Sequence, residues 1–183
     1  MTNEYAAGIT IGGAKQEELP DILALLDECE LPKEGLAAHM STTLVARYGN
    51  EIVGCSALEL YQQYALLRSV AVKPSFRGRG LAVRLTRAAL NLAKHHLVTT
   101  VYLLTETAST FFSKLGFATI PRSDVPQKVQ GSVEFTTLCP DTATVLTIAL
   151  DSVGTFQNIA QKGKSEYRIN PHTYEEELED RTR

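Results

Sequence analysis

The stretch SVAVKPSFRGRGLA, residues 69–82, joins an apolar run to a glycine-rich turn and then to a helical pattern. Residues 65–72 are apolar and rich in β-formers, while residues 81–97 carry apolar side chains at helical spacing. The sequence therefore predicts a strand, a turn built on Gly78 and Gly80, and an amphipathic helix. Glycines let the backbone approach a ligand closely and a helix N-terminus favours an anion, so this turn can hold a phosphate group.

The context of the turn weighs against two other interpretations. A nucleic-acid-binding RGG segment is disfavoured because the turn occurs once and the formal net charge of the chain is -3. A dinucleotide fingerprint is disfavoured because Val83 stands where a third glycine is required and a β-meander precedes the turn. The residues of the turn leave two interpretations open, a glycine turn without a ligand and a cradle for a diphosphate.

The segments around the turn predict alternating strands and helices. Residues 5–13 predict a first strand, residues 16–29 an amphipathic helix, and residues 42–61 a hairpin with Gly49-Asn50 at its turn. With residues 65–72 these make three consecutive antiparallel strands. After the amphipathic helix we expect a strand over 99–106, a helix over 107–115, a strand over 116–120, a last strand over 131–139 and a short closing helix over 141–150.

Length and composition indicate one globular domain with an extension. The 183 residues are 44% hydrophobic, no stretch is apolar for long enough to span a membrane, and the N-terminus lacks the pattern of a signal peptide. Three cysteines are too few for a disulfide framework or a zinc cluster. We therefore expect a cytoplasmic protein with no metal, no nucleic-acid partner and no membrane partner. Residues 1–150 are the expected domain, and the polar residues 151–183 an arm or a partly disordered extension.

Two motifs resemble those of one enzyme family. Arg77, Gly80 and Ala82, placed after VAVKPSF and before a helix, resemble the Arg-x-x-Gly-x-Ala signature of the GCN5-related N-acetyltransferases, the GNAT family. The segment TETASTFFSKLGF resembles the second motif of that family. The resemblance covers residues 5–148 and is greatest to the subfamily found in arsenic-resistance operons. It implies an α/β (α+β) GNAT fold, in which helices flank a mixed sheet of six to seven strands with one splayed parallel pair.

The resemblance also implies where acetyl-CoA binds. In the family the cofactor lies between the splayed strands, which end here at Val72 and Thr105, and the main-chain N–H of Val70 points at the thioester carbonyl. An amine then attacks the acetyl group directly, so catalysis consists mainly of positioning and of polarising the oxyanion. The implied cofactor-binding residues are Val70, Ala71, Val72, Arg77, Gly78, Arg79, Gly80, Leu81, Ala82, Thr105, Ala108, Phe111 and Phe112.

Two residues depart from the family pattern. Thr105 replaces the asparagine that holds pantetheine, and Phe112 replaces the tyrosine that protonates the departing thiolate. Because Phe112 has no proton to donate, Ser109, Thr105 or a water is the candidate acid. Phe111 and Phe112 are equally well interpreted as core aromatic residues, and Ser109 as a solvated helix residue.

The attacking amine must lose a proton, and carboxylates near the site strand are candidates for the base. Glu59 is the first candidate and Glu106 the second. Arg68 stands two residues before Val70, which predicts the same strand face. It either forms a structural ion pair with Glu59 or clamps an anionic group of the substrate. Cys139 is expected to be a small buried residue rather than an arsenic ligand.

The sequence thus predicts an acetyl-CoA-dependent N-acetyltransferase acting on a primary amine of a small molecule, including an arsenic- or phosphinate-containing amino acid. The alternative is a non-catalytic module of the same fold that binds acetyl-CoA or CoA as a sensor or docking domain, which Thr105 and Phe112 motivate. The loops at residues 29–42 and 120–132 are expected to hold the acceptor, and a homodimer is the expected assembly.

Overall fold

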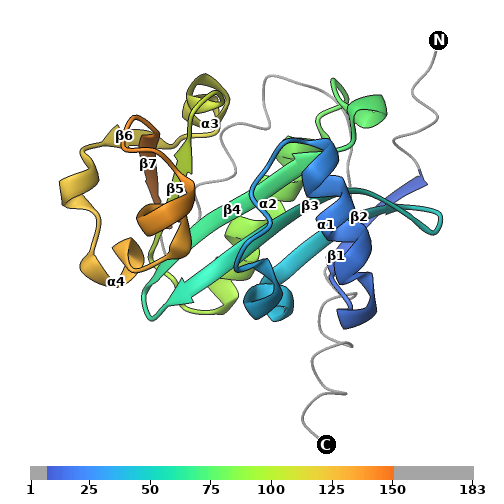
Figure 1. Ribbon diagram of the computed structural model, residues 1–183, viewed down its shortest axis with the longest axis horizontal. Helices are drawn as coiled ribbons and strands as arrows, with labels where there is room; N and C mark the ends of the chain where they lie inside the picture. The colour runs from blue at the N-terminus through green and yellow to red at the C-terminus, as the bar shows by residue number, and fades with distance from the viewer. Residues whose placement is uncertain (1–7, 151–183) are drawn as a thin grey trace, which may run out of the picture. The chain divides into compact units, whose positions relative to one another are not determined.

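The computed structural model describes residues 8–150, and within them one seven-stranded mixed sheet has the order β1-β2-β3-β4-β5-β7-β6 (Figure 1). The predictions made for residues 151–183 lie outside the described residues. The sheet and its flanking helices confirm the predicted fold class. None of the helices in the described part of the chain is both long and apolar enough to cross a membrane.

The first half of the domain is an antiparallel meander with one helix. The elements are β1 (Ile9–Gly13), the 3-10 turn η2 (Gln16–Glu18), α1 (Leu19–Glu28), the 3-10 segment η3 (Leu36–Thr42), β2 (Thr43–Tyr48), β3 (Glu51–Tyr61) and β4 (Tyr64–Val72). Pro20 lies in the first turn of α1, where its missing N–H leaves no helical hydrogen bond unmade. The predicted hairpin forms at Gly49, whose φ of 58° suits a tight turn.

The second half begins at the glycine turn. Its elements are η4 (Pro74–Phe76), α2 (Leu81–His95), β5 (Thr100–Thr105), α3 (Ser109–Lys114), β6 (Ala118–Ile120), η5 (Arg122–Asp124), α4 (Gln127–Gln130), the π-helix η6 (Glu134–Leu138) and β7 (Thr144–Ala149). The helix α2 runs from the glycine turn beneath the meander, as its amphipathic pattern predicts.

Helices α1 and α2 cover opposite faces of the meander (Figure 1). On one face Ile22 and Leu25 of α1 pack with Ala57 and Ala71. On the other face Ala89 of α2 packs in a separate cluster, with Leu58 and Leu67 among its members. Burial of these apolar side chains fixes the sheet between two helical layers and leaves the ends of the central strands accessible.

Strands β4 and β5 are the parallel pair, and they separate along their length. Their register is limited to three pairs, from Tyr64 with Thr100 to Leu66 with Tyr102. Beyond Leu66 the two strands diverge, since β4 continues to Val72 beside β3 while β5 stays paired with β7. The prediction of a splayed parallel pair is therefore confirmed.

The last part of the chain differs from the prediction. Residues 131–139, predicted as the last strand, form the π-helix η6, and residues 141–150, predicted as a closing helix, contain β7. Both segments are rich in β-branched residues, so local preference does not choose between them. Strand pairing decides which segment becomes the strand, because residues 144–149 form β7 and pair with β5 on one side and with β6 on the other.

A β-bulge in β4 overturns a second prediction. Arg68 pairs with Ala57 and Ala71 with Cys55, so one residue of β3 faces two residues of β4, Ser69 and Val70. Ser69 has a φ of 54°, and the extra residue shifts the alternation of side chains. Arg68 and Val70 therefore lie on opposite faces of the sheet, not on the same face.

Candidate active site

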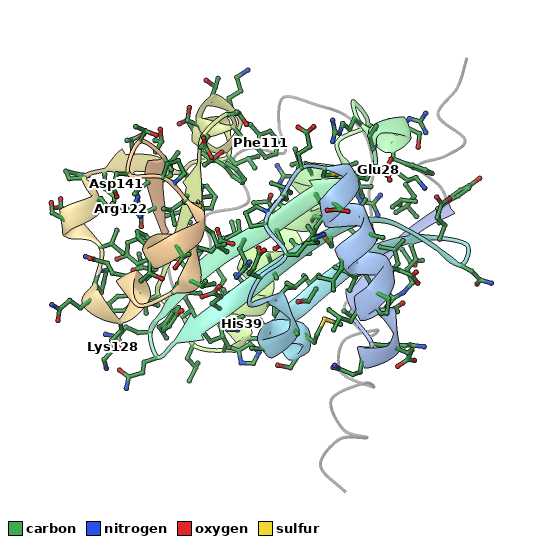
Figure 2. All side chains as sticks on the ribbon, viewed as in Figure 1. Glu28, His39, Phe111, Arg122, Lys128 and Asp141 are labelled. Atoms are coloured by element: carbon green, nitrogen blue, oxygen red, sulfur yellow. The ribbon has the colours of Figure 1, made fainter. Side chains whose placement is uncertain are left out.

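The divergence of β4 and β5 opens a cleft of about 550 Å³. The residues that line it are 66–72 of β4, 103–105 at the end of β5 with 106–108 after it, 29–32 after α1, Arg77, Ala82, Phe111, Phe112, Glu134, Leu138 and Cys139. Figure 2 shows Phe111 on α3, between the end of β5 and the end of β4. Most of the residues predicted to hold the cofactor are thus brought to one cleft by the splayed strands.

The glycine turn forms an open cradle at the start of α2. Gly78 and Gly80 both have a φ of 75°, and a Cβ placed on either would meet no atom within 4 Å. Among the described residues no hydrogen-bond acceptor is found for the N–H groups of these two glycines. Gly80 is also the N-cap of α2, so the first amides of that helix point toward the same space. Converging amides at a helix N-terminus suit a diphosphate.

The arginines of the turn are held by the protein. Arg77 donates through Nε to the carbonyl oxygen of Val72 at 3.0 Å, and its Nη2 lies 3.5 Å from the Cys29 sulfur. The guanidinium of Arg79 lies 5.7 Å from the ring centroid of Phe76. Both side chains are therefore positioned by contacts within the protein, and Arg77 lines the cleft.

The second motif shapes the opposite wall. Thr105 accepts a hydrogen bond from the N–H of Ala108 at 3.0 Å, and its own hydroxyl proton remains available to a ligand. Phe112 lines the cleft and packs edge-on against Phe111 and Phe117, with centroid distances of 5.0 and 5.7 Å. Phe112 is therefore both a core aromatic and a wall of the cleft, so its two interpretations are compatible.

Arg68 is the centre of a buried ionic cluster. Its Nη1 donates to Glu59 Oε1 and its Nη2 donates to the carbonyl oxygen of Glu34, each at 2.7 Å. Nη2 also forms an ion pair with Glu134 Oε1 at 2.7 Å. The side chains of Arg68 and Glu59 are each 2% exposed. Arg68 thus links three parts of the chain beside the cleft: β3, the loop after α1 and the π-helix η6.

Glu59 is enclosed by this cluster. Its Oε2 accepts a hydrogen bond from the Tyr61 hydroxyl at 2.6 Å, and Oε1 faces Arg68, so both oxygens are occupied. Burial acts to raise the pKa of Glu59, but the hydrogen bonds from Tyr61, Ser132 and Arg68 outweigh burial and lower the pKa. Glu59 is not among the residues lining the cleft. The structure therefore forms the ion pair that was one of the two interpretations of Arg68.

Of the other two predicted catalytic side chains, one lines the cleft and one does not. Glu106 lines the cleft and is exposed, while Ser109 lies on α3 and does not line the cleft. Within residues 8–150 no three His, Cys, Asp or Glu side chains converge as ligands for a metal ion.

Sequence reasoning missed Glu134. It lines the cleft, is 8% exposed, and accepts a hydrogen bond from the Cys139 thiol at Oε2 over 3.2 Å. Burial, together with the hydrogen bond to Glu134 and its charge, raises the pKa of Cys139 to about 12. A signal existed in the sequence, because an isolated glutamate in the apolar run SVEF is unusual. The run was interpreted as a strand, and that hid the position of the side chain.

Gly35 closes the cluster from the loop after α1. Its φ is 78°, and an added Cβ would lie 2.9 Å from Val133 Cγ1 and 3.3 Å from Arg68 Nη1. We expect Gly35→Ala to lower the free energy of unfolding by about 2–3 kcal/mol, because left-handed backbone strain and overpacking add. Gly49→Ala is the control, since Gly49 also has a positive φ but its Cβ would meet open space. Its expected loss is about 1 kcal/mol. Equal losses in urea denaturation would show that the contact is unimportant.

Comparisons with known proteins agree with this geometry. Residues 39–119 match the model of an acetyltransferase (GNAT) domain. An uncharacterized N-acetyltransferase of Chlorobaculum tepidum is 32% identical over 97 residues, which cover 52% of this chain and 62% of that protein. The chain thus spans less than two thirds of the length of this relative.

Solved structures share the fold. N-acetylglutamate synthase from Neisseria gonorrhoeae, complexed with coenzyme A and N-acetyl-glutamate, superposes with a TM-score of 0.68 at 20% identity, covering 78% of this chain and 35% of that one. A Mycobacterium tuberculosis protein in complex with CoA gives a TM-score of 0.66 at 23% identity, covering 77% of this chain and 99% of that one. The strand order and the splayed parallel pair agree with this likeness, so the described residues have the fold of these acetyltransferases, and residues 39–119 are similar to a GNAT domain.

Proposed function

We propose that the protein is an acetyl-CoA-dependent N-acetyltransferase that acts on a primary amine of a small molecule. The observation that carries this proposal is the cleft between β4 and β5, whose lining includes Arg77 and Ala82, the residues that flank the glycine turn with its open positions at Gly78 and Gly80. A diphosphate fits the cradle, and the pantetheine arm fits along the unpaired length of β4. The cofactor is acetyl-CoA as co-substrate, with no metal.

The bulge in β4 supports a specific position for the thioester. Val70 has no partner in the register with β3, and the ladder to β5 ends at Leu66. Val70 therefore lies outside both registers, and it lines the cleft. We place the thioester carbonyl at the Val70 N–H, which would stabilise the oxyanion formed when the amine attacks.

The acceptor is proposed to be compact. A cleft of about 550 Å³ must hold the end of the pantetheine arm as well as the amine. The resemblance to the arsenic-resistance subfamily extends the proposal to arsenic- or phosphinate-containing amino acids. A cytoplasmic homodimer with residues 151–183 as an extension remains our expectation for the whole chain.

A second candidate is a CoA-binding sensor or docking module without catalysis. Phe112, which cannot donate a proton, favours it. The two candidates are separated by calorimetry with acetyl-CoA followed by an assay for free thiol with a panel of primary amines. Binding with thiol release supports the enzyme, binding without release for any amine supports the sensor, and no binding of acetyl-CoA contradicts both.

Phe112→Tyr tests whether a tyrosine at residue 112 can protonate the departing thiolate, a role that phenylalanine cannot fill. We expect kcat to rise about 10-fold or more, because a positioned acid contributes roughly 10²–10⁴-fold and the Phe112 ring already lines the cleft. Phe117→Tyr is the control, since Phe117 contacts Phe112 but does not line the cleft. It should lose stability without a gain in kcat. An unchanged kcat in Phe112→Tyr would place the phenol out of reach of the sulfur.

A further inference from the structure

We infer that Glu134 is the residue that binds the ammonium group of the acceptor and takes its proton, and that Arg68 positions it. This inference rests on the proposed function, because it assigns a residue to the proposed reaction. It begins from three carboxylates that line the cleft, Glu30, Glu106 and Glu134. Glu30 and Glu106 are exposed to solvent, whereas Glu134 is buried.

The charges around Glu134 do not balance. The Arg68 guanidinium contacts two carboxylates, Glu59 and Glu134, at 2.7 Å each. One positive and two negative groups leave a formal charge of -1 when His39 is neutral. His39 Nε2 lies 3.8 Å from Glu59 Oε1, and neither residue lines the cleft. Of the two carboxylates only Glu134 lines the cleft, so a cation bound there would offset the excess negative charge.

The second oxygen of Glu134 has a partner that a substrate can replace. Oε1 is held by Arg68, while the one donor found for Oε2 within residues 8–150 is the weak S–H group of Cys139 at 3.2 Å. The raised pKa of Cys139 keeps that partner a neutral thiol. An ammonium is a much stronger donor to a carboxylate, so binding of a protonated amine at Oε2 is favoured.

The backbone around Glu134 is held in place for this task. The Glu134 N–H donates to Ser132 Oγ at 3.1 Å, and Arg122 Nη2 donates to the carbonyl oxygen of Phe135 at 2.6 Å. Glu134 begins the π-helix η6, and such helices often occur at functional sites. Figure 2 shows Arg122 in the half of the sheet that contains β6 and β7, from which it anchors this segment.

The proton balance of the reaction is complete with this assignment. An acceptor R–NH₃⁺ gives one proton to Glu134, and the nitrogen lone pair then forms the N–C bond to the thioester carbonyl. The C–S bond breaks as the tetrahedral intermediate collapses, and the second amine proton passes to the CoA thiolate. Glu134 returns its proton to water, so the products are the acetamide, CoA–SH and one proton.

The test compares Glu134→Gln with Glu106→Gln and with Glu51→Gln, a matched loss of charge at an exposed glutamate of β3. We expect Glu134→Gln to lower kcat/KM for the amine at least about 100-fold, while CoA affinity and Tm stay near wild type. Its activity should recover as the pH rises and the amine loses its proton in solution. Arg68 and Cys139 contact Glu134, and Glu59, Tyr61 and His39 complete the cluster around Arg68. Glu106 and Arg122 act on Cys139, and all of these groups are unchanged in this variant.

A binding measurement separates this inference from the proposed function. Titration of the CoA-loaded protein with the same amines should show weaker binding to Glu134→Gln than to wild type, even if wild type releases no thiol. Absence of thiol release would contradict the proposed function, whereas equal amine affinity in the two proteins would overturn the assignment of Glu134. A loss in Glu106→Gln with none in Glu134→Gln would also overturn it.

A second variant covers the case in which Glu134→Gln does not fold. Glu134→Asp keeps the charge beside Arg68 but withdraws it by one methylene. We expect amine binding to be retained and kcat to fall, because the carboxylate no longer reaches the amine. An unchanged kcat in a folded Glu134→Asp would contradict the inference.

Discussion

Replacing Gly80 with valine is expected to raise the dissociation constant for CoA about 100-fold, which corresponds to about 2.8 kcal/mol. Gly80 has a φ of 75° and caps α2 beside an open cradle. A branched side chain disfavours this backbone conformation and projects into the space that the diphosphate would occupy. Loss of one or two amide contacts to a charged group accounts for an effect of this size.

The control for this variant is Gly49→Val. Gly49 also has a positive φ, 58°, and a Cβ there meets no atom within 4 Å, but it lies in the β2–β3 hairpin. Both variants should lose about 1–2 kcal/mol of stability from the backbone, while only Gly80→Val loses CoA affinity. Isothermal titration calorimetry checks this result. Equal CoA affinity in the two variants would remove the cradle from the binding site.

Arg68→Met is expected to have the largest effect on stability, a loss of about 3–5 kcal/mol at pH 7. The substitution keeps much of the side-chain volume but leaves Glu59 and Glu134 buried without their guanidinium partner. Lys33→Met is the comparison, since Lys33 and Asp27 form an exposed pair whose side chains are 42% and 70% accessible. Its expected loss is at most about 1 kcal/mol in urea denaturation.

The pH dependence of that loss follows from the lowered pKa of Glu59. In wild type the pKa of Glu59 lies below its ordinary value of 4.5, so the stability it contributes is present above that pH and is lost as the pH falls through the folded-state pKa. Arg68→Met removes one of the contacts that lower the pKa of Glu59, so the variant should lose less stability than wild type on acidification. The difference between wild type and Arg68→Met should therefore narrow below about pH 4.5. A difference that stays constant from pH 7 to pH 4 would show that Glu59 does not titrate with folding.

Local sequence was informative where one pattern dominated a segment. The hairpin at Gly49, the amphipathic helix α2 and the glycine turn before it were predicted within a few residues of their observed bounds. Sequence failed at residues 131–150, where two segments with similar β-preference follow each other. Only one of them can occupy the position between β5 and β6, and partners distant in the sequence made that selection.

The same distinction applies to the candidate site. The cradle of Gly78 and Gly80 depends on backbone conformations that glycine alone adopts readily, and a single short motif therefore predicts it. The face of Arg68 was predicted wrongly because the bulge at Ser69 changes the alternation, and a period of two carries no information about an inserted residue. The burial of Glu59 and the position of Glu134 depend on how loops pack against Arg68, which no local pattern records.

The sequence by itself determined the order of the elements through α3 and the turn before α2, because helix periodicity and glycine φ values are properties of neighbouring residues. Tertiary structure alone decided which strand lies between β5 and β6, which face of β4 presents Arg68, and that Glu134 lines the cleft. Those outcomes depend on pairing, packing and charge compensation between residues far apart in the chain. The sequence of one segment therefore does not determine them.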